Sequence, residues 1–178
     1  MSDDLPILIV DDEDKWRNKL KAMLVEVRYA VDSVSGLEEA RERFQRGKRY
    51  AALTVDLRLG EDGAQGLELL RVLQFLESTR YSQGPAIVLS AYPDLAEESL
   101  QRGAYAFFNK ALLPDQQREF LETIARAVEE GKQQIAALRE KVKLEYQRLT
   151  KRFLRGKTIS FSVPPEAENP WAKLASQR

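Results

Sequence analysis

The chain has 178 residues, of which 43% are hydrophobic, and its 28 basic and 28 acidic residues give a formal net charge of zero. This length fits one domain of roughly 100 to 150 residues plus an appendage. Neither cysteine nor histidine is present, which excludes disulfides, thiolate metal sites, cysteine nucleophiles and histidine-based triads. Residues 1–4 are acidic and no long apolar run follows, so we expect a cytoplasmic protein without a signal sequence or transmembrane segment.

Short, nearly continuous apolar runs predict strands that are buried on both faces of a parallel sheet. The runs cover residues 6–10, 50–55, 86–89 and 104–108, with a weaker one at residues 29–34. Helical spacing of apolar residues separates them, at residues 16–27, 36–45, 67–76 and 93–101. Strand and helix therefore alternate five times, which predicts an α/β fold with a doubly wound, five-stranded parallel sheet.

The ends of the predicted strands carry a set of polar side chains. Asp11 and Asp12 follow the first strand and Asp56 follows the third. Ser90 and Lys110 follow the fourth and fifth strands. Because the ligand crevice of such a sheet lies at the carboxyl ends of its strands, we expect these five residues to meet there.

These residue types indicate phosphoryl chemistry. Three carboxylates in one cleft repel one another unless a cation lies among them, and a hard ion such as Mg²⁺ suits oxygen ligands. Lys110 and Ser90 suit phosphoryl oxygens, which leaves Asp56 as the nucleophile. Singly, each residue also has an ordinary explanation: the Asp pair as a helix N-cap, Ser90 as a turn hydroxyl and Lys110 as a solvated strand end. The ordered set favours a joint site.

Several segments together resemble the receiver domain of bacterial two-component response regulators. They are residues 7–13 (ILIVDDE), 53–57 (LTVDL), 66–70 (GLELL), 87–91 (IVLSA) and 103–110 (GAYAFFNK). The resemblance covers about residues 5–130 and implies a flavodoxin-like receiver fold. It also implies a signalling switch rather than an enzyme, with a sensor histidine kinase as phosphoryl donor.

The resemblance assigns a role to each site residue. It implies that Asp56 is the phosphoacceptor, that Asp12 binds Mg²⁺ directly, and that Asp11 does so largely through water. The backbone carbonyl of Arg58 would complete the protein ligands of the metal. Ser90 and Lys110 would hold phosphoryl oxygens. Ser90 would also act in the switch with Phe107, whose ring turns inward when the hydroxyl residue moves.

The chain departs from the family pattern in three places. Ala111 stands where a proline with a cis peptide bond is usual, so we expect a trans link or a shifted loop. The loop of residues 57–65 lacks the usual Met-Pro and is about two residues longer. Arg58 and Tyr92 occupy positions at which the family tunes loss of the phosphoryl group. We hypothesise that these two side chains restrict the attacking water and give a long-lived phosphoaspartate; the alternative is that both point away from the site.

A long helix is predicted from about Pro114 to Leu154. Apolar or small residues recur along it at alternating steps of three and four, at Leu121, Ile124, Val128, Gly131, Ile135, Leu138 and Val142. This heptad pattern predicts a coiled-coil extension over residues 131–155, with Gly131 as a weak point that costs about 1 kcal/mol in helix propensity. The preferred partner is a second copy in a parallel homodimer, while another protein and a fold-back onto the same domain stay open.

Charge allows a second interpretation of the extension. Residues 139–157 contain eight basic and two acidic residues, so contact with nucleic acid or an anionic membrane surface is possible, although a solvated coiled-coil face is preferred. Residues 156–178 form a tail that is either a docking peptide, with Phe161, Trp171 and Leu174 as apolar anchors, or a disordered terminus.

These observations predict a response regulator that signals through protein contact and dimerisation by its last helix. One rival is a phosphatase with an aspartyl nucleophile, but its nucleophile would lie on the first strand and Asp56 would have no role. The other rival is a transcription regulator that binds DNA through the basic helix.

Overall fold

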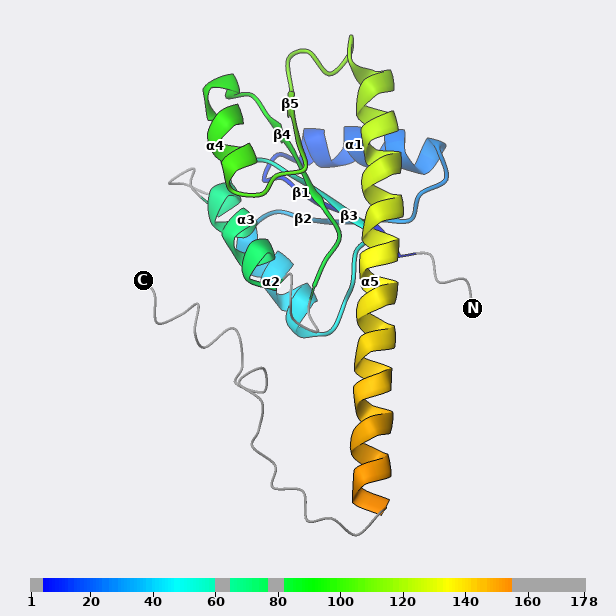
Figure 1. Ribbon diagram of the computed structural model, residues 1–178. Coiled ribbons are helices and arrows are strands. Elements are labelled where there is room, and N and C mark those ends of the chain that lie inside the picture. Colours follow the sequence, from blue (N-terminus) through cyan, green and yellow to red (C-terminus); the bar gives the residue numbers. More distant parts are fainter. Residues whose placement is uncertain (1–4, 60–64, 77–81, 155–178) are drawn as a thin grey trace.

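The structure is a computed structural model that describes residues 5–59, 65–76 and 82–154. Its centre is a five-stranded sheet (Figure 1), formed by β1 (Ile7–Val10), β2 (Val31–Val34), β3 (Ala52–Val55), β4 (Ala86–Ser90) and β5 (Ala106–Asn109). Every neighbouring pair is parallel. The strand order β2-β1-β3-β4-β5 is that of flavodoxin-like folds. The predicted α/β, doubly wound parallel sheet is confirmed.

Helices cover both faces of this sheet. They are α1 (Asp14–Glu26), α2 (Leu37–Gln45), α3 (Gln65–Leu76), α4 (Ala96–Gln101) and α5 (Gln117–Leu154), and a 3₁₀ turn, η1 (Pro93–Leu95), precedes α4. Because successive side chains of a strand point to opposite faces, Leu8 and Val10 join one buried cluster while Ile7 and Ile9 join the other. We call the sheet with η1 and α1 to α4 the α/β body.

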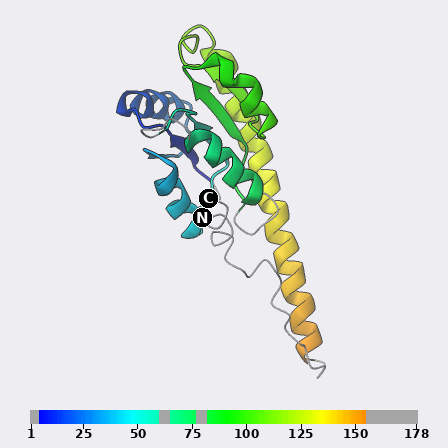
Figure 2. The same ribbon diagram turned by 90° about the vertical axis from the view of Figure 1, so that its left-hand side faces the viewer.

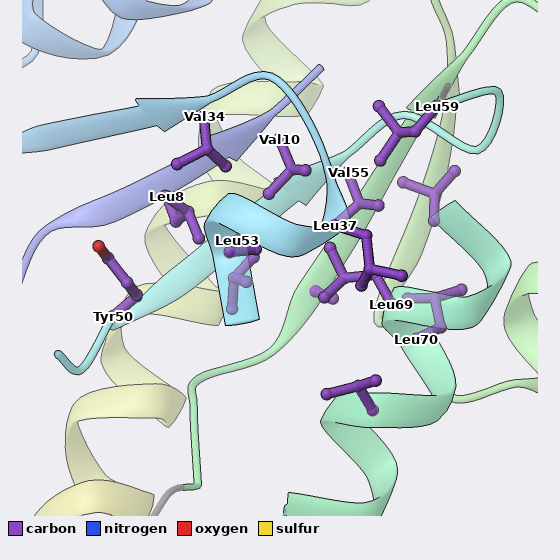
Figure 3. Close-up of a cluster of buried hydrophobic side chains, with 14 of the residues drawn as sticks. Leu8, Val10, Val34, Leu37, Tyr50, Leu53, Val55, Leu59, Leu69 and Leu70 are labelled. Carbon is purple, nitrogen blue, oxygen red and sulfur yellow. The ribbon is translucent and has the colours of Figure 1, made fainter. Parts of the chain in front are cut away.

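Each face has its own apolar core. Side chains of α2 and α3 meet one face, and Figure 3 shows Leu37, Leu69 and Leu70 pointing toward the side chains of β1 and β3. The opposite core contains residues of α1 and the first half of α5, with Phe108 and Phe120 in edge-to-face contact at 5.2 Å between ring centroids. Continuous burial of β1, β3 and β4 explains why their sequences read as unbroken apolar runs.

Boundaries differ from the prediction at two elements. Helix α5 begins at Gln117 rather than near Pro114, because the preceding residues form turns in which the N–H of Gln116 donates to the carbonyl of Leu112 at 3.0 Å. Strand β2 begins at Val31 rather than Tyr29. The N–H of Tyr29 instead donates to the carbonyl of Leu24 at 3.0 Å, which closes the end of α1.

Burial along α5 continues to Ile135, five residues beyond the predicted end of the domain. Ile124, Val128 and Ile135 are buried. Gly131 lies so close to the sheet that a Cβ atom there would stand 1.9 Å from the carbonyl oxygen of Ala51. The interpretation of Gly131 as a weak point in a coiled-coil seam is therefore wrong: this glycine allows the helix to approach the sheet.

Beyond Ile135, α5 leaves the α/β body (Figures 1 and 2). At 1.5 Å per residue the whole helix is about 57 Å long. Leu138, Val142, Tyr146 and Leu149 continue the apolar stripe that faces the sheet earlier in the helix, and Val142 and Tyr146 are 53% and 71% exposed. We call these four residues the distal stripe. Within the described ranges, no helix is both long and apolar enough to cross a membrane.

Candidate functional site

Three acidic residues gather at the carboxyl ends of β1 and β3. Val10 is paired with Val55, and the N–H of Asp56 donates to the carbonyl of Val10 at 2.9 Å, so Asp11 and Asp56 follow neighbouring strand ends. Both are buried, whereas Asp12 is exposed. One carboxylate oxygen from each of the three lies within 4.8 Å of the others. The structure thus brings together the predicted metal-ligating carboxylates.

Lys110 is the cation buried against this cluster. Its Nζ lies 2.7 Å from Oδ2 of Asp56 and 2.8 Å from Oδ2 of Asp11. A third carboxylate, that of Glu13, is 3.4 Å away. A single ammonium therefore faces several carboxylates, and the site keeps a net negative charge.

Burial and the ion pairs with Lys110 shift the pKa values of groups in this cluster. Desolvation raises the pKa of Asp11, and the hydrogen bond and charge of Lys110 offset only part of that effect. Burial alone would lower the pKa of Lys110, but its hydrogen bonds to Asp11 and Asp56 outweigh burial and raise that pKa. Lys110 is therefore a fixed positive charge at neutral pH.

The hydroxyl of Ser90 lies at the end of β4 without a hydrogen-bond partner. The residue is fully buried, and Oγ is one of three such buried side-chain atoms found among the described residues. The N–H of Lys110 donates to the carbonyl of Ser90 at 2.9 Å, which ties the two residues together. A buried hydroxyl without a partner is costly, and a ligand oxygen would satisfy it.

Gly66 supports the backbone of Asp56. A Cβ at position 66 would stand 2.1 Å from the carbonyl oxygen of Asp56 and 2.4 Å from Cα of Leu57. The first turn of α3 can therefore pack directly under the acidic strand end only with glycine at this position.

Arg58 and Tyr92 contact each other, one following β3 and the other β4. The guanidinium carbon of Arg58 lies 4.5 Å from the centroid of the Tyr92 ring, which is a cation–π contact. The N–H of Arg58 donates to Oδ1 of Asp56 at 3.3 Å. The two side chains thus form a pair that is anchored beside the acidic cluster; the metal-binding role of the Arg58 carbonyl stays a prediction.

Phe107 and Ala111 flank the lysine end of the site. Phe107 is half-buried on β5 and packs against the core cluster that includes α2 and α3. No cis peptide bond is present among the described residues, so the expected trans link before Ala111 is confirmed. Most of the loop expected to be longer, residues 60–64, lies outside the described residues.

Two contacts of Lys110 were missed in the sequence. Besides the carboxylate of Glu13, the ring of Trp16 lies beside the ammonium, with its centroid 5.1 Å from Nζ. Glu13 directly follows Asp11 and Asp12 in the sequence, so its carboxylate could have been counted as part of the acidic site. The sequence does place Trp16 close behind the acidic pair, where it could report metal binding, but its contact with Lys110 depends on how α1 turns relative to β5 and could not have been inferred.

The donor set fits a hard divalent cation. All the acidic ligand atoms are carboxylate oxygens, which Mg²⁺ prefers. The cluster has more negative than positive charge even with Lys110 present, and the backbone of Lys110 is hydrogen-bonded to that of Ser90, whose hydroxyl has no partner. A bound cation would balance the excess negative charge, and a phosphoryl oxygen would accept a hydrogen bond from the Ser90 hydroxyl.

Residues 7–125 match the family described as the response regulator receiver domain. The chain belongs to this family. Receiver domains are signalling switches of two-component systems, and they typically bind Mg²⁺ at an acidic pocket of this kind.

Relatives place the receiver within larger proteins. The chain is 35% identical over 121 residues to the response regulator protein PilR of Pseudomonas aeruginosa, which covers 67% of this chain and 26% of PilR. It is 30% identical to the sensory/regulatory protein RpfC of Xanthomonas campestris over 67% of this chain and 16% of RpfC. The chain thus spans about a quarter or less of these curated relatives.

A solved receiver structure gives a further comparison. The response regulator TrrA of Thermotoga maritima, in complex with Mg²⁺-BeF, matches at 26% identity with a TM-score of 0.53. The match covers 66% of this chain and 96% of TrrA. Like the matches to PilR and RpfC, the match to TrrA covers about two thirds of this chain.

Proposed function

We propose that this receiver accepts a phosphoryl group on Asp56 and signals through its extended last helix. The observation that carries the proposal is the acidic cluster of the buried Asp11 and Asp56 and the exposed Asp12, in which Asp11 and Asp56 share a single ammonium, that of Lys110. A sensor histidine kinase is the donor that the family implies. The complex of TrrA with Mg²⁺-BeF supports the same use of the pocket.

The transfer forms a bond between a carboxylate oxygen of Asp56 and phosphorus and breaks the bond between phosphorus and a histidine nitrogen of the donor, which then takes up a proton. Lys110, held by Asp11 and Asp56, offers its charge to one phosphoryl oxygen. Ser90 donates its unpartnered hydroxyl to another. Asp11, Asp12, Asp56 and the carbonyl of Arg58 would hold Mg²⁺, which when bound neutralises charge on the carboxylates and the phosphoryl oxygens.

The contact between Arg58 and Tyr92 leads to a kinetic prediction. If the pair restricts the attacking water, phosphorylated protein will persist far longer than seconds, and Arg58→Ala or Tyr92→Ala will hydrolyse severalfold faster. The exposed Arg46, at the end of α2, provides the control Arg46→Ala. The check is loss of phosphate from purified phosphoprotein in magnesium buffer. A lifetime of seconds in the parent, or equal rates in all variants, would count against this role.

The output is proposed to pass through α4, β5 and α5. Phosphorylation would draw Ser90 toward the phosphoryl group, and the half-buried ring of Phe107 on β5 would follow. Helix α5 carries the distal stripe out of the domain, with Val142 and Tyr146 exposed and Leu138 and Leu149 partly buried. That stripe offers an apolar surface for a homodimer, with its seam beginning after Ile135.

Sedimentation with beryllofluoride and magnesium tests this function. Beryllofluoride mimics the phosphoryl group on an aspartate, so both together should change the association state and the fluorescence of Trp16, which lies beside Lys110. Asp56→Asn should abolish both responses. The signal is measured in Trp171→Phe protein, in which Trp16 is the single tryptophan. An unchanged Trp16 signal there would reject the role of the pocket in phosphoryl binding, and a changed signal without altered association would reject the link to the helix.

DNA binding by the extension is the second candidate. Its support is the net basic charge of residues 139–157. At the helical repeat, however, Lys141 and Arg148 lie roughly opposite Arg139 and Lys143, so the basic side chains do not form one face. Salt-sensitive binding to a DNA duplex would favour this function.

A further inference from the structure

A notch lies where α5 leaves the α/β body. Its cavity volume is about 510 Å³, and it is lined by Gly47, Arg49, Ile135, Leu138, Arg139, Val142, Lys143 and Tyr146. One side of the notch is formed by α5, which contributes the first three residues of the distal stripe, Leu138, Val142 and Tyr146. The other side contains Gly47 and Arg49, which belong to the segment between α2 and β3. This size lies within the range of about 300 to 1,000 Å³ that is usual for ligand pockets.

The lining combines apolar surface with one sign of charge. Val142 and Tyr146 are mostly exposed apolar or aromatic groups. The charged lining residues, Arg49, Arg139 and Lys143, are all basic, and Lys143 also lies 3.4 Å from the carboxylate of Glu140 on its own helix. An occupant with apolar or aromatic anchors and acidic groups suits this lining. Basic groups beside an indole also offer cation–π contacts.

The C-terminal sequence of the same chain has this composition. Residues 164–174 read PPEAENPWAKL, with Trp171 and Leu174 as apolar anchors. The charged residues of this segment are Glu166, Glu168 and Lys173, so the segment carries a net charge of −1. Proline-rich segments with an aromatic anchor are well suited to shallow grooves, because little conformational entropy is lost on binding.

The length of chain also permits the contact. Along α5, the notch lies about 12 to 30 Å before Leu154 at 1.5 Å per residue. The 17 residues from Leu154 to Trp171 can span up to about 55 Å when extended. A tethered segment also has a high effective concentration at a site on its own chain.

A second copy fits the notch less well. Its α5 extension is itself basic, so in the proposed dimer it would add like charges beside Arg139 and Lys143, which favours the tail over a second copy but leaves the apolar surface of the distal stripe available to both. The notch also opens on the side of α5 that its own α/β body occupies, as Gly47 and Arg49 in the lining show. A narrow peptide needs less room at that position than a partner helix.

We propose that residues 164–174 bind in this notch on their own chain, with Trp171 against Val142 and Tyr146 and with Glu166 and Glu168 facing the basic lining. The tail then covers the surface that the proposed dimer would use, so tail and partner compete for it. The contact does not depend on phosphorylation of Asp56.

The fluorescence of Trp171 tests the proposal in the full-length chain without magnesium or a phosphoryl donor. Trp16→Phe leaves Trp171 as the single tryptophan. In this protein Trp171 should be shielded from acrylamide. Val142→Asp should increase the quenching severalfold, and so should the double substitution of Glu166→Lys with Glu168→Lys.

Leu144→Asp is the matched control. Leu144 is 62% exposed on α5, as accessible as Val142, but lies about 200° around the helix from it. This variant should leave Trp171 shielded. Equal quenching with and without Val142→Asp would overturn the proposal. Shielding that disappears on dilution together with dimers seen in sedimentation would also overturn it, because the occupant would then come from a second copy.

Discussion

Lys110→Ala is expected to lower the free energy of unfolding by about 3 to 5 kcal/mol in the absence of divalent cations, the usual cost of removing one partner of a buried ion pair. Asp11 and Asp56 are both buried, and both have Lys110 Nζ within 2.8 Å. Magnesium should stabilise the variant more than it stabilises the parent, because the ammonium no longer competes for the carboxylates. Urea unfolding with EDTA or with Mg²⁺ measures both effects.

Lys141→Ala is the control for this experiment, because Lys141 is exposed on the extension of α5. Its effect should stay within about 0.5 kcal/mol, as for most surface substitutions. The electrostatic account fails if the two variants lose equal stability. It also fails if magnesium stabilises the Lys110 variant less than the parent.

Gly131→Ala is expected to destabilise the protein even though alanine favours helices. Helix propensity alone predicts a gain of about 1 kcal/mol. However, the new Cβ would stand 1.9 Å from the carbonyl oxygen of Ala51 and 2.9 Å from Cα of Gly84. Overpacking of this kind costs about 1 to 3 kcal/mol or more, so α5 must move from the sheet and the net effect is a loss.

Ala137→Gly, at an exposed site of the same helix, measures the propensity term by itself and should cost about 1 kcal/mol. Denaturant unfolding of both variants shows whether Gly131 is packed against the sheet or lies in a coiled-coil seam. A stabilised Gly131 variant would show that this glycine belongs to an exposed coiled-coil position.

The fold and the main site residues could be predicted because the sheet is parallel and buried. Strands such as Ile7–Val10 and Ala52–Val55 must be apolar on both faces. The polar residue that follows each strand then lies at the edge where ligands bind. Asp11, Asp56 and Lys110 are therefore found together, as their order in the sequence indicates.

What the sequence could not reveal depends on contacts between distant elements. Steps of three and four describe one face of a helix, but they do not say whether a sheet or a second helix covers it. Gly131 shows the difference, because it lies against the backbone of Ala51 and Gly84 beside the sheet. Likewise, only the fold shows that the Ser90 hydroxyl lacks a partner or that the guanidinium of Arg58 lies over the ring of Tyr92.

The most direct test of phosphoryl acceptance is intact mass spectrometry of the full-length chain after incubation with acetyl phosphate and magnesium. We expect one added phosphate on the parent protein and none on Asp56→Asn, with the modification lost when magnesium is chelated before the donor is added. An unmodified parent, or equal modification of the Asp56→Asn variant, would contradict the assignment of Asp56 as the phosphoacceptor.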